Sequence, residues 1–292
     1  MYYLTGFADE AAESLDGQIK ATKELGWKYI ESRNINGKNI INLSDKEFDT
    51  VCAKLEDAGV KINCFGSEIA NWGKQITDPF TSSLEETRRA IPRMQKLGTK
   101  LIRMMSFAVL DDRDPDDQME EERFKRLREL QKMFSDAGIT PVHENCMNYG
   151  GMGWTYTLKL LENVPGLKLV YDTGNPVFTK DRTKSKPYPM ESSWEFYSNV
   201  KEHIEYVHIK DGFYDKKSEK SIFTYPGEGD GDVKRIVADL LKNGYSGGFS
   251  MEPHMGEVFH DDSVKLGNDE KYSIYVEYGR RFEKILADIS KK

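Results

Sequence analysis

The feature of this sequence that most restricts its fold is a junction that recurs along the chain. In six places an apolar, helix-like stretch ends in glycine and a β-rich run follows at once, and these glycines are Gly26, Gly59, Gly98, Gly138, Gly166 and Gly244. Glycine suits the position just past a helix C-terminus because it has no Cβ to clash in the left-handed conformation. The chain is therefore predicted to alternate helix and strand. The longer interval between Gly166 and Gly244 has room for two strand–helix units.

Eight short strands are predicted between helices whose apolar residues recur at helical spacing. The strands are residues 4–7, 29–32, 61–65, 101–105, 140–144, 169–172, 206–210 and 248–252. Strand and helix in alternation imply a parallel sheet, and eight such units in 292 residues fit a single (β/α)8 TIM barrel. An open doubly wound sheet is the alternative, but the turn after the first strand lacks a glycine-rich phosphate-binding motif. No linker interrupts the pattern, so residues 1–292 are predicted to be one domain.

Composition excludes several classes of partner and compartment. The net charge of −7 would repel a phosphate backbone, so nucleic acid is not an expected partner. No stretch approaches the roughly 20 apolar residues that span a bilayer, and the N-terminus reads as a strand rather than a signal peptide. Three scattered cysteines do not suit a disulfide scaffold. A cytoplasmic protein without a membrane partner is expected.

Acidic residues and one histidine stand at the predicted ends of four consecutive strands. Glu144 and Asp172 each lie six residues after a junction glycine, which places them at the same height on neighbouring strands. His208 lies near the end of the seventh predicted strand, and Glu252 ends the eighth. Because the carboxyl ends of barrel strands meet at one mouth, these side chains are expected to converge there.

Three carboxylates and one imidazole form a ligand set for a divalent cation. Such a set suits Mn²⁺, Mg²⁺ or Co²⁺, and Zn²⁺ is also compatible. Each residue has an ordinary structural explanation as well. Glu144 could be a solvated acid, Asp172 a turn residue, His208 a half-buried core histidine and Glu252 a helix-dipole partner. Their coincidence on four strand ends favours the metal site.

The strand ends resemble those of the xylose isomerase-like TIM barrels, a family that includes sugar and sugar phosphate isomerases and epimerases, inosose dehydratases and endonuclease IV. The resemblance rests on residues 143–145 (His-Glu-Asn), 172–176 (Asp-Thr-Gly-Asn-Pro), 207–211 (Val-His-Ile-Lys-Asp), 226–232 (Pro-Gly-Glu-Gly-Asp-Gly-Asp) and 250–253 (Ser-Met-Glu-Pro). It implies one divalent cation held by Glu144, Asp172, His208 and Glu252.

Two positions depart from the family pattern. Epimerases and endonuclease IV usually carry Asp-x-x-His on the sixth strand, whereas this chain has Asn175 in place of the histidine. That departure argues against a nuclease with three metals. Many epimerases also place an arginine shortly after the histidine of the seventh strand, where this chain offers Lys210 and Lys216. The second departure counts against epimerisation of ketoses at C3 in particular.

The predicted function is a divalent-metal-dependent isomerase or epimerase of a sugar or sugar phosphate. The cation would polarise a carbonyl, while Glu144 and Glu252 would transfer protons on opposite faces of the substrate through an enediolate. The predicted substrate-binding residues are Asn145, Asn175, Lys210, Asp211, Trp154, Glu31 and Arg103, with Trp72 as a second loop aromatic. Two alternatives stay open: a dehydratase or lyase of keto-sugars or inososes that uses the same metal site, and a non-catalytic carbohydrate-binding barrel. The oligomeric state is also open, a homo-oligomer included.

Overall fold

Eight parallel strands form the centre of the molecule in the computed structural model, which describes residues 2–258 and 261–291. In spatial order they are β1 (Tyr3–Gly6), β12 (Gly248–Met251), β9 (Ile204–Ile209), β8 (Lys168–Asp172), β7 (Thr140–Glu144), β6 (Leu101–Met104), β5 (Lys61–Gly66) and β2 (Tyr29–Ser32). A parallel bridge between Phe7 and Glu31 joins the two outer strands of this order. The chain therefore folds as a (β/α)8 barrel, as predicted, and each predicted strand is present with its ends shifted by about two residues or fewer.

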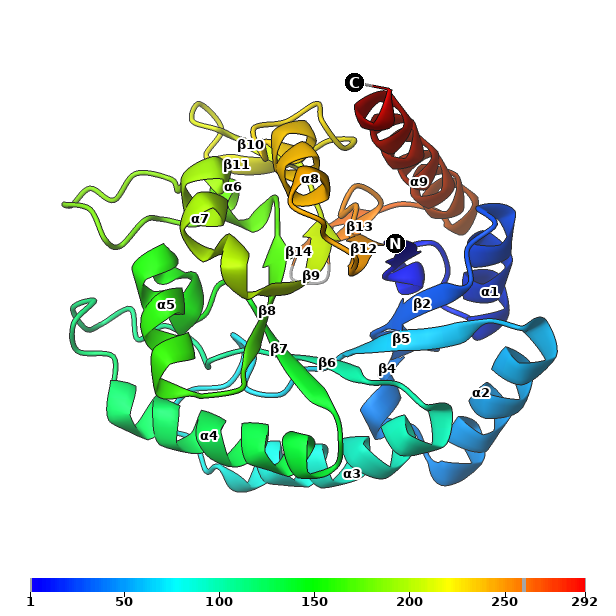
Figure 1. The fold of residues 1–292 in the computed structure, drawn as a ribbon, viewed down its shortest axis with the longest axis horizontal. Helices are drawn as coiled ribbons and strands as arrows, with labels where there is room; N and C mark the ends of the chain where they lie inside the picture. Colours follow the sequence, from blue (N-terminus) through cyan, green and yellow to red (C-terminus); the bar gives the residue numbers. More distant parts are fainter. Residues whose placement is uncertain (1, 259–260, 292) are drawn as a thin grey trace.

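Helices surround the sheet and alternate with its strands (Figure 1). They are α1 (Leu15–Glu24), α2 (Asp45–Ala58), α3 (Thr81–Leu97), α4 (Glu120–Asp136), α5 (Trp154–Asn163), α7 (Ser193–Val200), α8 (Val233–Lys242) and α9 (Asn268–Ser290). All six junction glycines have a positive φ, between 66° and 87°. The predicted left-handed junctions are therefore present, and they end the helices where the strands begin.

The strands separate an outer core from a barrel interior. Outward side chains such as Phe249 pack against the helices, and its ring lies 5.4 Å from that of Phe282 on α9. A small second cluster, made of Cys64, Val142, Val170 and Tyr206, is fully buried inside the barrel. Ser250 also points inward, since its hydroxyl donates to the Glu31 carboxylate. Side chains of β12 therefore alternate between the helices and the barrel interior.

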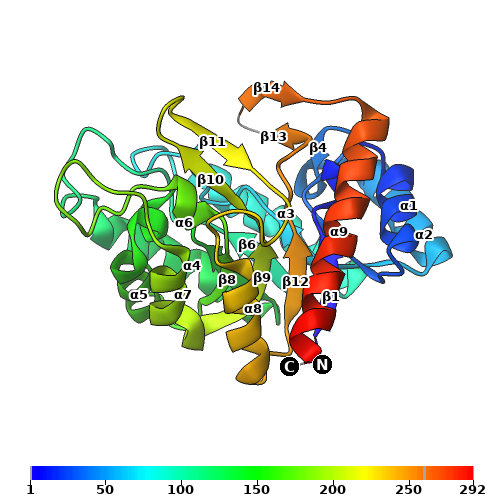
Figure 2. The same cartoon turned by 90° about the horizontal axis from the view of Figure 1, so that it is seen from above.

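Short elements gather at the end of the barrel where the strands end, opposite the chain termini (Figure 2). They include the two-stranded units β3 (Asn34–Ile35) with β4 (Lys38–Asn39), β10 (Gly212–Asp215) with β11 (Lys220–Phe223), and β13 (Glu257–Val258) with β14 (Asp261–Lys265). The short helix α6 (Asn175–Phe178) and the 3-10 turns η1 (Ala8–Glu10) and η3 (Tyr149–Met152) follow strands directly. The sequence pattern did not predict these pieces, which shape the mouth of the barrel.

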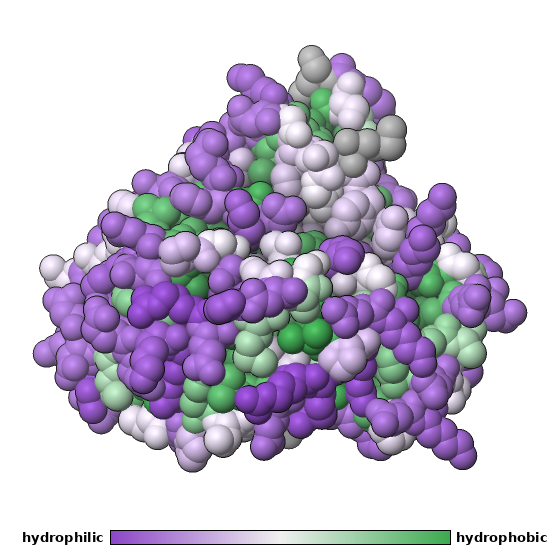
Figure 3. All heavy atoms as spheres, turned by 60° about the horizontal axis from the view of Figure 1, so that its bottom comes forward, coloured by the Kyte–Doolittle hydropathy of each residue, from purple (hydrophilic) through white to green (hydrophobic). Residues whose placement is uncertain are grey.

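The face of the molecule in Figure 3 is mainly hydrophilic and shows only separate hydrophobic areas. None of the described helices combines the length and the apolar character needed to cross a membrane. Among the side chains that the structure describes, the large hydrophobic ones that are exposed are Trp72, Met147, Phe213 and Ile222. Trp72 and Met147 line a cavity at the mouth of the barrel, and the other two belong to the β10–β11 hairpin. The exposed apolar groups are thus concentrated at the end of the barrel that carries the candidate site.

Candidate metal centre and adjoining cavity

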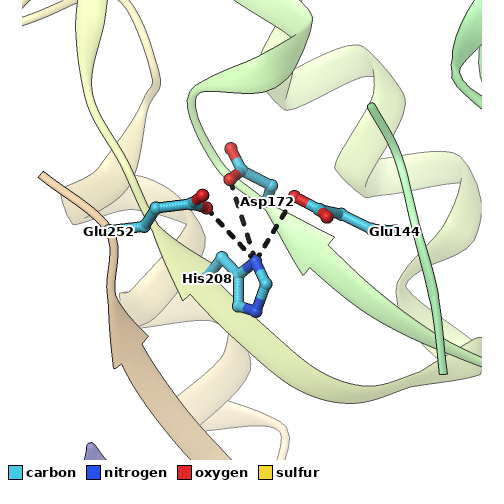
Figure 4. A group of neighbouring side chains, drawn as sticks. All are labelled: Glu144, Asp172, His208 and Glu252. Atoms are coloured by element: carbon cyan, nitrogen blue, oxygen red, sulfur yellow. Dashed lines mark ion pairs between the residues drawn. The ribbon is translucent and has the colours of Figure 1, made fainter. Parts of the chain in front are cut away.

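Four buried side chains from adjacent strands converge at the mouth of the barrel. Glu144 ends β7, Asp172 ends β8, His208 lies in β9, and Glu252 directly follows β12. His208 Nδ1 lies 3.4 Å from Glu144 Oε1, 3.4 Å from Glu252 Oε2 and 4.0 Å from Asp172 Oδ2. Figure 4 shows the two glutamates approaching from opposite sides, with the imidazole between them. The structure therefore brings together the four side chains that the sequence placed at strand ends.

Three atoms of this group lack the hydrogen bonds that buried polar atoms normally make. Within the described part of the chain, Asp172 Oδ2, His208 Nδ1 and Glu252 Oε2 have no hydrogen-bond partner. Each of the four residues offers a ligand atom, and these atoms lie within 4.8 Å of one another. Burying a polar atom without a partner is costly. The donor set and its unpartnered atoms fit a divalent cation.

Glu31 lies beneath His208, inside the barrel. Its Oε1 lies 3.2 Å from His208 Nε2, and its Oε2 accepts hydrogen bonds from Tyr206 (2.9 Å) and Ser250 (2.6 Å). A carboxylate on the far imidazole nitrogen fixes the ring and leaves the near nitrogen to a metal. Glu31 is fully buried and is not among the residues that line the cavity. Glu31 therefore lies outside the cavity with its carboxylate directed at His208, and its contact with substrate stays a prediction.

Backbone groups around Asp172 fix its carboxylate. Asp172 Oδ1 accepts hydrogen bonds from the backbone N–H groups of Gly174 (2.8 Å) and Asn175 (2.7 Å), which leaves Oδ2 facing His208. The Asn145 side chain donates to the Asp172 carbonyl and accepts from its N–H. Asn145 thus ties the end of β7 to β8 and does not line the cavity. The structure shows this structural link for Asn145, and its contact with substrate stays a prediction.

Each glutamate places one oxygen near His208 and the other near an arginine. Arg103 Nη1 on β6 lies 3.0 Å from Glu144 Oε2, and Arg33 Nη1 lies 3.5 Å from Glu252 Oε1. Both guanidinium groups stack on the ring of Phe7, at 4.4 Å for Arg33 and 5.1 Å for Arg103. Both arginines also line the cavity. Arg103 therefore lies where the sequence placed it, whereas Arg33, directly after β2, was missed.

Lys210 and Asn175 connect the glutamates across the floor of the cavity. Lys210 Nζ lies 3.0 Å from Asp172 Oδ2 and 3.1 Å from Glu252 Oε2, and it donates to Asn175 Oδ1. Asn175 Nδ2 in turn donates to Glu144 Oε1 at 3.1 Å. Both side chains line the cavity, as a substrate-binding role requires.

The local charges shift the pKa values of the group in opposite directions. Burial raises the pKa of Glu144, but Arg103 and His208 outweigh it and lower the value to about 2. Burial together with Glu252 and Glu144 raises the pKa of Asp172 to about 7, although Lys210 acts against them. Burial lowers the pKa of His208, yet Glu31 and the other carboxylates raise it well above its usual value. A site that perturbs its acids this strongly is typical of a metal or catalytic centre.

A cavity of about 270 Å³ opens directly above these groups. Its polar floor is formed by Arg33, Arg103, Glu144, Lys210, Glu252 and His254, and its apolar wall by Trp72, Met105, Met147, Phe178 and Phe223. The volume lies just below the roughly 300–1,000 Å³ of sites for drug-sized ligands. A small, polar substrate with one apolar face suits this cavity.

Two further predicted contacts lie outside the cavity. Trp154, at the start of α5, borders a separate small pocket with Asp181 and Glu191, so the aromatic wall contains Trp72 instead. Asp211 accepts hydrogen bonds from the backbone N–H groups of four glycines, Gly212, Gly227, Gly229 and Gly231. The substrate contacts of Trp154 and Asp211 stay predictions, because both side chains lie outside this cavity. The Asp211 carboxylate holds residues 226–232 through three of these hydrogen bonds.

His254 is a cavity residue that the sequence analysis did not select. Its Nδ1 lies 2.9 Å from Glu10 Oε1, its backbone N–H donates to Glu10 Oε2, and its Nε2 lies 3.6 Å from Glu252 Oε1. Its backbone is left-handed, with φ 54°. The available signal was its position two residues after Glu252, in Glu-Pro-His.

A comparison with protein families agrees with this geometry. The model of the xylose isomerase-like TIM barrel family matches residues 19–271. The chain belongs to this family. No curated protein sequence matches the chain.

Several solved structures share the fold of this xylose isomerase-like barrel. A xylose isomerase-like TIM barrel protein from Mycobacterium smegmatis, in complex with magnesium, is 17% identical, with a TM-score of 0.71 over 99% of this chain and 97% of that chain. A probable 3-DHS dehydratase from Bacillus anthracis is 16% identical, with a TM-score of 0.69 over 97% and 99% of the two chains. A D-allulose 3-epimerase from Methylomonas sp., in complex with D-allulose, is 16% identical, with a TM-score of 0.66 over 97% and 96%. At these identities the similarity establishes the fold.

Proposed function

We propose that this protein is a divalent-metal-dependent isomerase or epimerase of a sugar or sugar phosphate. The observation that carries the proposal is the pair Glu144 and Glu252, which face each other across His208 from opposite sides of one small cavity. The similarity to a D-allulose 3-epimerase and to a protein that holds magnesium supports the same assignment.

Glu144, Asp172, His208 and Glu252 would hold the ion, for which Mn²⁺, Mg²⁺ and Co²⁺ are the best candidates. When bound, the ion acts as a Lewis acid that polarises a substrate carbonyl and so makes the neighbouring C–H acidic.

Proton transfer falls to the two glutamates. One of them removes the proton next to the carbonyl, and the other returns a proton. Return to the opposite face of the same carbon gives epimerisation, and return to the neighbouring carbon of the enediolate gives isomerisation. Arg103, 3.0 Å from Glu144 Oε2, fixes the direction of that carboxylate, and Arg33 lies 3.5 Å from Glu252 Oε1. Lys210 and Asn175 offer hydrogen bonds to substrate hydroxyls, and Trp72 packs against the apolar face of the sugar.

A dehydratase acting on a keto-sugar or inosose is the second candidate. It would use the same carbanion-forming step, followed by loss of a hydroxyl group. The similarity to a probable 3-DHS dehydratase favours it, as does the lysine at position 210 in a region where many epimerases place an arginine.

Solvent exchange tests both candidates. The protein is loaded with Mn²⁺ or Mg²⁺ and incubated in D₂O with a panel of ketoses, aldoses and inososes, and the products are followed by NMR. An isomerase or epimerase incorporates deuterium beside the carbonyl, whereas a dehydratase forms an unsaturated product that absorbs in the ultraviolet.

Glutamine variants connect the activity to the two carboxylates. Glu144→Gln and Glu252→Gln are each expected to lower exchange by about 10²–10⁴-fold, because each removes a general acid–base group. Glu202→Gln, at an exposed position far along the chain from both, is the control. Exchange that persists at the same rate after removal of the metal would contradict the proposal. Binding of a sugar without exchange, unaffected by both variants, would instead indicate a carbohydrate-binding barrel.

A further inference from the structure

The ammonium group of Lys210 lies among the oxygen atoms that the proposed ion would use. Its Nζ is 3.0 Å from Asp172 Oδ2 and 3.1 Å from Glu252 Oε2, and the Lys210 side chain is only 4% exposed. These two oxygens are also the ones that face His208 Nδ1. The lysine and a bound cation would therefore act on the same pair of carboxylate oxygens.

The contact of Lys210 with these oxygens is one of charge rather than of hydrogen bonding. Asp172 Oδ2 and Glu252 Oε2 have no hydrogen-bond partner in the described structure, although the ammonium lies close to both. The hydrogen bond that Nζ does make goes to Asn175 Oδ1, at 3.1 Å. Lys210 thus has an anchor that does not belong to the proposed ligand set.

The two arginines of the site pair mainly with other acids, whereas the His208 imidazole faces the same two oxygens as Lys210. Arg103 pairs with Glu144, and Arg33 pairs with Asp9 and Glu10 at shorter distances than its 3.5 Å contact with Glu252. The buried carboxylates of Asp172 and Glu252 consequently share the positive charge of Lys210. Two buried carboxylates repel each other strongly unless a cation stands between them.

We propose that Lys210 is a built-in counter-cation of the metal centre, which stabilises the site before the ion binds and lowers its affinity for the ion. The inference rests on the metal site of the proposed function. A fixed positive charge in contact with two ligand oxygens opposes a divalent cation that must use the same oxygens. The ion is then held less tightly than by three unopposed carboxylates, and its binding moves the ammonium away from the shared oxygens.

Manganese binding without substrate tests this inference, with free Mn²⁺ measured by electron paramagnetic resonance. Lys210→Met, which removes the charge, is expected to bind Mn²⁺ at least about tenfold more tightly than the natural protein. Lys210→Arg keeps the charge and is expected to stay within about threefold of it. Lys201→Met is the control, because Lys201 pairs with Asp239 outside the site.

Thermal unfolding in EDTA provides the second measurement. Lys210→Met is expected to unfold at a lower temperature than the natural protein without metal and to gain more from added Mn²⁺. Lys210→Gln, which also lacks the charge but can still hydrogen-bond Asn175, repeats the affinity test if the methionine variant is unstable. A neutral variant that folds only with Mn²⁺ would support the inference.

The contrary results are distinct. Unchanged or weaker Mn²⁺ affinity in both neutral variants would overturn the inference and would mean that Lys210 holds the carboxylates in place for the ion. A natural protein that binds no Mn²⁺ would overturn the metal centre of the proposed function, and the role of Lys210 with it.

Discussion

At the scale of single residues, the site depends on the hydrogen bonds that orient its ligand side chains on the side away from the proposed ion. The Glu31 carboxylate accepts hydrogen bonds from Tyr206 and Ser250 and lies at hydrogen-bonding distance from His208 Nε2. All three partners are buried inside the barrel. Asp172 is fixed in a comparable way by two backbone N–H groups. The ligands are thus positioned before an ion arrives, which is what a metal site of useful affinity requires.

Replacement of Glu31 tests this positioning. Glu31→Gln is expected to weaken Mn²⁺ binding by about 10–100-fold, because a partner of this kind orients the imidazole and raises its basicity. The measurement is the Mn²⁺ titration used for the Lys210 variants, and the two changes should act in opposite directions. Glu205→Gln, exposed on the same strand as His208, is the matched control. Equal affinities in Glu31→Gln and the control would show that Glu31 does not position the ligand.

The sequence predicted the proposed ligands better than the residues around them. Glu144 and Asp172 could be aligned because each follows a junction glycine at the same distance and ends a strand. The directions of Asn145 and Asp211 could not be predicted, because both lie just past a strand end. There the local turn, rather than the two-residue alternation of a strand, decides where a side chain points.

At the scale of elements, the local sequence pattern predicted the strands and helices of the barrel. It did not predict the short hairpins and turns that lie over the site. The β10–β11 hairpin has strands of four residues, and most of its side chains are exposed or half-buried, so no apolar alternation marks it. Tertiary contacts hold it instead, including the rings of Phe178 and Phe223 with centroids 4.9 Å apart. Contacts between segments distant in sequence leave no local signal.

The segment between α6 and α7 contains a buried acid, Glu191, whose effect on the free energy of unfolding varies with pH. Burial, with Asp181 and Glu195 nearby, raises the pKa of Glu191 well above its usual value, and its Oε1 has no hydrogen-bond partner in the described part of the chain. The folded protein therefore keeps this proton after the unfolded chain has released it. As a result, the contribution of Glu191 to stability falls as pH rises from about 4.5 towards its native pKa.

Glu191→Gln is expected to stabilise the protein at pH 8 by about 1–2 kcal/mol, since it removes a buried acid that lacks a partner. At this chain length each kcal/mol corresponds to roughly 2–4 °C in the unfolding temperature. The gain should shrink towards pH 4.5, and thermal unfolding across this range measures it. Glu129→Gln, exposed on α4, should show no such trend. A gain that does not vary with pH, or a loss, would contradict this account of Glu191.

At the scale of the whole molecule, closure of the barrel and formation of the site involve the same residues. The bridge between Phe7 and Glu31 closes the sheet, and the side chain of Glu31 orients His208. The Phe7 ring lies 5.1 Å from that of His208 and beneath the two arginines that hold the glutamates. The fold was predictable from the glycines that end the helices and from the β-rich runs that follow them. The composition of the cavity was not, because it is assembled from turns and hairpins that follow several different strands.

The central claim is that one divalent ion binds among Glu144, Asp172, His208 and Glu252. The most direct measurement is a crystal structure of the protein grown with Mn²⁺, with anomalous scattering recorded to locate the ion. The account predicts a single strong peak at coordination distance from His208 Nδ1 and the three carboxylates, and its loss in Glu252→Gln. A peak elsewhere, for example between Glu10 and His254, or no peak among these four side chains, would contradict it.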